Sequence, residues 1–313
     1  MDKRGIIKFI VTLLIITFMV GISETLNDRE IIFPEIAAIA VGAFIAPTFA
    51  WNTNYKRIFV LICISAVIGV LIVKFLPIPI AFQAVIAFAL AQMIFINSGT
   101  SFAPMISAMV LPVLLQTSSI VYIISAISLT LLILIIRFIL EKSGISETIS
   151  FKTAPLANKN TYLLSLIRIL FGGIILIAAI YSGHQFAAAP PFLVSFTEMS
   201  KTNSKAIKSP LKVFAIMSVC GIIGAIVRYI FSIKFHLLPL AVSALITIFI
   251  VLLIMQKTKL FIPPAGAIAI LAMLIPADRV IYYPLECIAG AFFVVLTSNI
   301  LVCIFQKQSY LKI

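Results

Sequence analysis

Charged side chains are scarce in this chain. They make up 11% of its 313 residues, and only 10 residues are aspartate or glutamate. A soluble domain carries about 25% charged residues. Hydrophobic residues instead make up 63% of the chain, and the mean hydropathy is +1.23. A soluble globule of this size cannot bury so much apolar surface, so the composition excludes a soluble enzyme and predicts an all-α protein that crosses a membrane many times.

The residues that carry most enzyme chemistry are also few. The chain has two histidines, and its four cysteines lie inside apolar runs without the spacing of a metal site. It lacks the glycine-rich nucleotide-binding patterns GxGxxG and P-loop. We therefore expect no enzymatic activity, no catalytic residue, no cofactor and no bound metal. The residues concerned are His184, His236, Cys63, Cys220, Cys287 and Cys303.

Apolar runs occupy most of the sequence and predict twelve membrane segments. Eight runs are long enough to cross a membrane, whereas the second, fifth, eighth and eleventh are shorter or broken and rich in small residues and proline. The runs lie near 5–23, 31–50, 58–76, 79–96, 101–115, 119–140, 161–182, 186–200, 212–232, 236–255, 262–276 and 282–305. The polar stretch 141–160 divides them into two sets of six, so we predict a repeat at 1–140, a linker at 141–160 and a second repeat at 161–313.

The two halves resemble each other in an ordered set of positions. A shift of 160 residues places Lys74-Phe75 on Lys234-Phe235. Further matches place Pro104 on Pro264, Tyr122 on Tyr282, Gly69 on Gly224 and Pro34 on Pro191. Because each half has an even number of segments, the halves should share one orientation and be related by an axis along the membrane normal.

Lysine and arginine dominate the charge, which is +13 in total. In a soluble protein this excess would suggest a nucleic-acid partner, but in a membrane protein basic loops fix the orientation. If all twelve segments cross, most of the basic residues fall on the side of the N-terminus. We therefore expect a multi-pass protein of the plasma membrane with both termini in the cytoplasm. The expected partners are the lipid bilayer and a small molecule or ion, and the sequence leaves a homo-oligomer open.

The run from Pro263 to Ala272, PPAGAIAILA, resembles the signature of the HPP family of integral membrane proteins, in which His-Pro-Pro-Ala-Gly-Ala opens a short helix. The segment PFLVSF at 191–196 is similar to a second stretch of that family. Ile262 stands where the family has histidine. The resemblance implies membrane transport, and nitrite has been proposed as the substrate of some plant and cyanobacterial members.

A weaker resemblance links Arg57 and the small-residue helix that follows it to the fusaric-acid-resistance type of aromatic-acid exporter. Those proteins usually carry a soluble domain, which this sequence lacks.

The short segments begin at proline, which suits the first turn of a helix. The free backbone N–H groups of a helix start carry partial positive charge and can bind an anion inside a membrane protein. Close packing of small residues is the alternative explanation of the same pattern. We predict a substrate site formed by Pro263, Pro264, Ala265, Gly266, Ala103, Pro104, Met105, Ile106, Pro34, Glu35, Pro191 and Phe192.

Three glutamates, Glu35, Glu198 and Glu286, fall inside or at the ends of apolar runs. A carboxylate inside a membrane is costly and suggests a functional role. The alternatives are capping of a helix start for Glu35, and ion pairs with Lys201 for Glu198 and with Arg279 for Glu286. Since the repeat gives none of them an acidic counterpart, the site should be asymmetric.

Together these patterns favour a transporter or channel for a small solute, either a small anion such as nitrite or a weak organic acid. The alternatives are a membrane scaffold, a subunit of a larger membrane complex, or an aromatic-acid exporter. A scaffold would need neither a duplication nor short helices rich in small residues.

Overall fold

The computed structural model describes residues 2–154, 157–201 and 209–310, and within these ranges all regular structure is helical. Eight helices are long and apolar enough to cross a membrane. This confirms the predicted all-α membrane protein. The long helices are α1 (Lys3–Thr25), α3 (Tyr55–Phe75), α4 (Ile80–Asn97), α6 (Ile120–Lys142), α7 (Lys159–Tyr181), α9 (Pro210–Val227), α10 (Leu240–Thr258) and α12 (Tyr283–Tyr310).

The four remaining segments are the short ones that the sequence predicts. They are α2 (Glu35–Ala40, continued by the π-helical turn η2, Val41–Ile45), α5 (Met105–Leu115), α8 (Pro190–Met199) and α11 (Pro263–Leu271). Three 3₁₀ turns, η1 (Arg29–Ile31), η3 (Gln185–Ala188) and η6 (Ala277–Arg279), precede α2, α8 and α12, and a π-helical turn, η5 (Arg228–Lys234), extends α9. Every residue of α2 and α11 is buried, so the short helices form the core.

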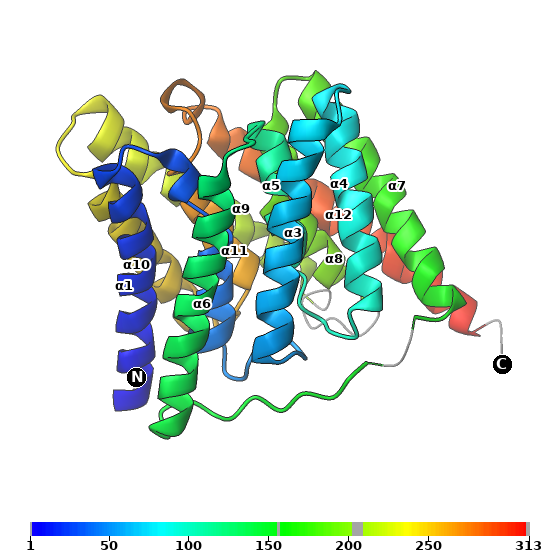
Figure 1. Ribbon diagram of the computed structural model, residues 1–313, viewed down its shortest axis with the longest axis horizontal. Coiled ribbons are helices and arrows are strands. Elements are labelled where there is room, and N and C mark those ends of the chain that lie inside the picture. The colour runs from blue at the N-terminus through cyan, green and yellow to red at the C-terminus, as the bar shows by residue number, and fades with distance from the viewer. Residues whose placement is uncertain (1, 155–156, 202–208, 311–313) are drawn as a thin grey trace.

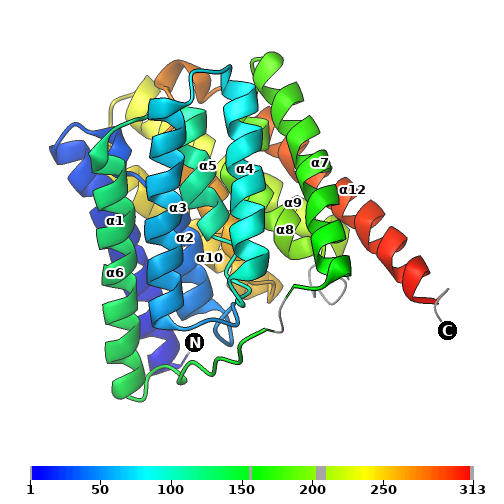
Figure 2. The same ribbon diagram turned by 45° about the vertical axis from the view of Figure 1, so that its right-hand side comes forward.

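The long helices surround the short ones, and both chain ends lie at the same end of the molecule (Figures 1 and 2). Helices α1, α3 and α6 stand together at one side, and α7 and α12 stand at the other. Polar side chains begin several long helices by accepting from a backbone N–H, as helix N-caps do. Asp2 accepts from Gly5, Asn54 from Arg57 and Asn158 from Thr161, each at 2.9 Å.

Helices from the two halves are interlocked rather than stacked side by side. Helix α1 packs on α10 of the other half, and α7 packs on α4. The short helices cross over in the same manner, because α2 packs on α11 and α5 on α8. Within each half, α3 packs on α5 and α6, and α9 packs on α11 and α12. The contact pattern is therefore the same when the halves are exchanged.

Individual contacts repeat as well. The hydroxyl of Tyr122 donates to the carbonyl of Ala108 at 2.9 Å, and that of Tyr283 donates to the carbonyl of Ile268 at 2.7 Å. The counterpart of Tyr122 is thus Tyr283, not Tyr282 as the sequence match suggested. The sequence could not separate the two because the residues are adjacent and identical.

Three arginines cap helix ends inside the bundle. Arg57 donates to the carbonyl of Ser98 after α4, Arg137 to Ala43 in η2, and Arg228 to Ala272 after α11. Arg137 and Arg228 are buried, at 4% and 2% exposure. Both residues fall inside predicted apolar runs, 119–140 and 212–232, and their guanidinium groups satisfy carbonyls at helix C-termini, where positive charge is favoured.

Two glycines allow the backbones to touch at equivalent places. A Cβ atom on Gly69 of α3 would overlap the carbonyl oxygen of Met109 in α5. A Cβ atom on Gly224 of α9 would overlap the carbonyl oxygen of Ala269 in α11. Each half thus holds its fifth segment against its third by direct backbone contact, the arrangement that small residues permit in membrane bundles.

We expect Gly69→Ala and Gly224→Ala each to lower the free energy of unfolding by about 2 kcal/mol, because neither backbone carbonyl can move aside cheaply. The matched control is Gly173→Ala in α7, where an added Cβ would meet Val85 at an ordinary 3.4 Å. Thermal unfolding in detergent measures all three. Equal melting temperatures for the three variants would contradict the backbone contact.

Candidate functional site

The candidate site lies where the four short helices meet in the centre of the bundle. Helix α11 packs on both α2 and α8, and α5 packs on α8. All predicted site residues are buried: Pro34, Glu35, Ala103, Pro104, Met105, Ile106, Pro191, Phe192, Pro263, Pro264, Ala265 and Gly266. In this arrangement the predicted site residues are enclosed by protein.

The structure brings some of the predicted helix starts together and separates others. A Cβ atom on Gly266 would lie 3.4 Å from the carbonyl oxygen of Ala37 and 3.3 Å from Val41, so the start of α11 crosses α2 and η2 closely. Phe192, at the start of α8, instead packs against Gly290 of α12. Phe192 therefore serves the contact between α8 and the outer wall.

Many amides at these helix starts already have acceptors. Each donates to the carbonyl three residues earlier, which is the 3₁₀-type pairing common in a first turn. The pairs are Ile36 to Phe33 at 3.0 Å, Ile106 to Ala103 at 2.9 Å, Phe192 to Ala189 at 2.9 Å, and Ala265 to Ile262 at 3.0 Å. These four amides are therefore not free donors, and a side chain at the site has unsatisfied polar atoms.

That group is the carboxyl group of Glu35, in the first turn of α2. Glu35 is 0% exposed, and neither of its oxygens has a hydrogen-bond partner. The hydroxyl of Ser107 on α5 and the carboxylate of Glu198 on α8 are the polar groups that act on it electrostatically. An ionised carboxylate without a partner would cost several kcal/mol here. Capping of its own helix start, the alternative reading, does not satisfy these oxygens.

A second carboxylate, Glu198, lies near the C-terminal end of α8. The indole Nε1 of Trp51 donates to Glu198 Oε1 at 2.8 Å. Trp51 stands in the loop between η2 and α3 and packs edge-on against Phe102, just before α5, with ring centroids 5.2 Å apart. The loop that holds Trp51 follows η2 and thereby contacts both the start of α5 and the end of α8. In addition, Gln92 of α4 donates to Thr197 of α8 at 2.6 Å.

Positive charge surrounds the end of α8. Arg168 of α7 is 3% exposed and donates through Nε to Ser200 at 2.7 Å. Lys201 follows α8, and its ammonium lies 5.2 Å from the ring centroid of Phe95. Burial lowers the pKa of Lys201 to about 8, although Glu198 opposes the shift. An anion entering from this end would therefore meet two cations close to the short helices.

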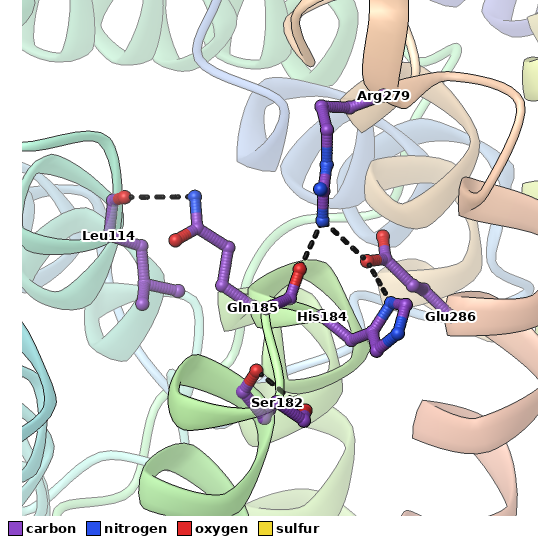
Figure 3. Close-up of polar contacts among 8 residues, drawn as sticks. Leu114, Ser182, His184, Gln185, Arg279 and Glu286 are labelled. Atoms are coloured by element: carbon purple, nitrogen blue, oxygen red, sulfur yellow. Dashed lines mark hydrogen bonds and ion pairs between the residues drawn. The ribbon is translucent and has the colours of Figure 1, made fainter.

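Sequence reasoning missed Trp51 and Gln92. The signals were weak: Trp51 is the sole tryptophan but falls in a loop, and its partner lies 147 residues away. Glu286, the third predicted carboxylate, does not join the site. It lies on α12 beside Arg279 and His184 (Figure 3).

The tight crossing at Gly266 predicts how this position tolerates side chains. We expect Gly266→Ala to melt near the wild type, because contacts of 3.3–3.4 Å need a shift of only a few tenths of an ångström. Gly266→Leu should lower the free energy of unfolding by about 3 kcal/mol or more, because the added atoms have no room. Detergent melting curves provide the measurement. A leucine variant as stable as the wild type would mean that α11 and α2 can separate at no cost.

Comparison of the chain with protein-family models, with curated proteins and with solved structures finds no match. The function must therefore be inferred from the residues of the site and from the physical demands of their surroundings.

Proposed function

We propose that the protein is a secondary transporter that moves a small anion, or a weak organic acid, together with a proton. The observation that carries the proposal is Glu35, a fully buried carboxyl group with two unpartnered oxygens. Intramembrane carboxyl groups of this kind mark proton pathways in pumps and transporters. In the closed arrangement Glu35 would be neutral, and release of its proton would require contact with water.

The position of Glu35 suits a coupling role. It lies on α2, which packs against α11 of the other half. Movement of one half against the other would therefore change the surroundings of its carboxyl group. Rocking of two repeats about a central site is the usual basis of alternating access. Opening toward either end would hydrate Glu35, and closing again would favour its protonated form. Proton transfer and helix movement are thereby linked through the cost of burying charge.

The identity of the solute rests on charge and on resemblance. Arg168 and Lys201 would attract an anion to the end of α8, and co-transport of one proton would make the step electroneutral. The HPP-like run 263–272 is the reason to include nitrite among the candidates. Ile262, in place of that family's histidine, removes one possible proton carrier and leaves Glu35 as the candidate. We further propose that the protein lies in the plasma membrane with both termini in the cytoplasm.

Reconstitution into liposomes tests the proposal. With an inward proton gradient, the wild type should accumulate labelled nitrite or a weak acid, up to about tenfold per pH unit for one proton per anion. Glu35→Gln should retain exchange of solute at equal concentrations but lose accumulation, because glutamine copies the neutral form and cannot release a proton. Emission from Trp51 adds a binding assay, since no other tryptophan is present.

The matched control is Glu24→Gln, which changes an exposed carboxylate that accepts from Leu240 at 2.8 Å. This variant should accumulate solute as the wild type does. Accumulation by Glu35→Gln at the wild-type level would overturn the role of Glu35. A folded wild type that moves none of the candidate solutes would overturn transport itself and favour a scaffold.

A further inference from the structure

An apolar groove runs between α7 and α12 on the outside of the bundle. It has a volume of about 460 Å³ and is floored by Ala187 of η3, on which both helices pack. Its walls are largely aliphatic and aromatic, as an acyl chain would require. The lining residues used below are Ile174, Ala178, Leu285, Ala289, Phe293 and Glu286.

One end of this groove is charged. Glu286 is 2% exposed, and its Oε1 lies 3.2 Å from His184 Nδ1 and 3.7 Å from Arg279 Nη2 (Figure 3). Arg279 also donates to the carbonyl of Gly183. The other oxygen of Glu286, Oε2, is buried and has no hydrogen-bond partner. Glu286 Oε2 thus lacks a hydrogen-bond donor, and leaving a buried acceptor without a donor costs free energy.

A similar groove exists in the first half, with Arg29 and Glu30 in the adjacent turn η1 but with no charged residue in its lining. Between α1 and α6 a groove of about 460 Å³ is lined by Phe18, Ile22, Ile124, Ser125 and Ser128. Matching Tyr122 with Tyr283 places Ser125 at the position of Glu286. The two grooves thus occupy equivalent places, but Glu286 and His184 line the groove between α7 and α12, whereas no charged residue lines the one between α1 and α6.

We propose that the groove between α7 and α12 binds one phospholipid whose headgroup carries a primary ammonium, as phosphatidylethanolamine does. The ammonium donates to Glu286 Oε2, the phosphate lies against Arg279 and His184, and one acyl chain follows the groove past Ala289 and Phe293. In this zwitterionic headgroup the ammonium is opposite in charge to Glu286, and the phosphate is opposite in charge to Arg279. A choline headgroup has no N–H to donate, so it leaves Oε2 unsatisfied.

The location agrees with this occupant. His184 and Arg279 are 55% and 35% exposed in their side chains, and both lie beside the C-terminal end of α7, as expected of residues that meet headgroups. Leu285 and Ile174 face outward at 70% and 58% exposure, so the groove opens to the hydrocarbon. A free amine in water would not explain the apolar length of the groove.

The first test uses the wild-type protein and a headgroup series. Nanodiscs are prepared with equal amounts of phosphatidylcholine and one competitor, which is phosphatidylethanolamine, its N-methyl form or its N,N-dimethyl form. Lipid that remains on the protein after mild detergent release is counted by native mass spectrometry. We expect one retained ethanolamine lipid per chain, enriched at least tenfold over choline, with retention falling as methyl groups replace N–H donors. Equal retention of choline lipid would overturn the proposal.

The second test compares the two grooves. Glu286→Gln should reduce the enrichment to the choline level, because an amide lacks the charge that holds the ammonium. Ser125→Ala, the matched change in the α1–α6 groove, should leave it unaltered. Melting in detergent checks that both variants are folded. Enrichment that survives in folded Glu286→Gln, or that moves to anionic phosphatidylglycerol in the wild type, would show a different site and contradict the proposal.

Discussion

Backbone polar groups cannot face lipid, and the architecture depends on that constraint. An 11-residue helix such as α5 is only about 16 Å long, roughly half the hydrocarbon core. Its ends therefore lie at a depth where only protein can satisfy them. The caps from Arg137 and Arg228 and the hydroxyl groups of Tyr122 and Tyr283 supply such partners to three of the short segments, η2 at the end of α2, α5 and α11. Eight long helices are needed because four short ones must be enclosed.

The duplicated halves have kept their framework and diverged where charge is placed. The contacts of Gly69 and Gly224 recur, as do the two outer grooves. Glu35, Glu198 and Glu286 have no acidic counterparts, and each lies at a place where its half departs from the other. The three carboxylates therefore make the charge distribution of an otherwise symmetrical bundle asymmetric.

Most of the fold could be predicted from the sequence. Hydropathy located the twelve segments, and proline with small residues identified the four short ones. Hydropathy could not show that α1 packs on α10, because a helix that is apolar all round gives no preferred face. The capping by Arg137 and Arg228 could not be predicted, because the carbonyls that they bind belong to distant segments. The site was found in part: Glu35 stood out as a buried charge, but the contact of Trp51 with Glu198 joins positions that no local pattern connects.

The exchange of helix partners between halves has a consequence for synthesis. Helix α1 leaves the ribosome first, yet the helix on which it packs, α10, begins more than 200 residues later at Leu240. Until then the side of α1 that packs on α10 has no partner from this chain. Helix α4 likewise waits for α7. The first half therefore enters the membrane before its contacts with the second half can form. The core, which contains short helices from both halves, can be completed only after the second half has been inserted.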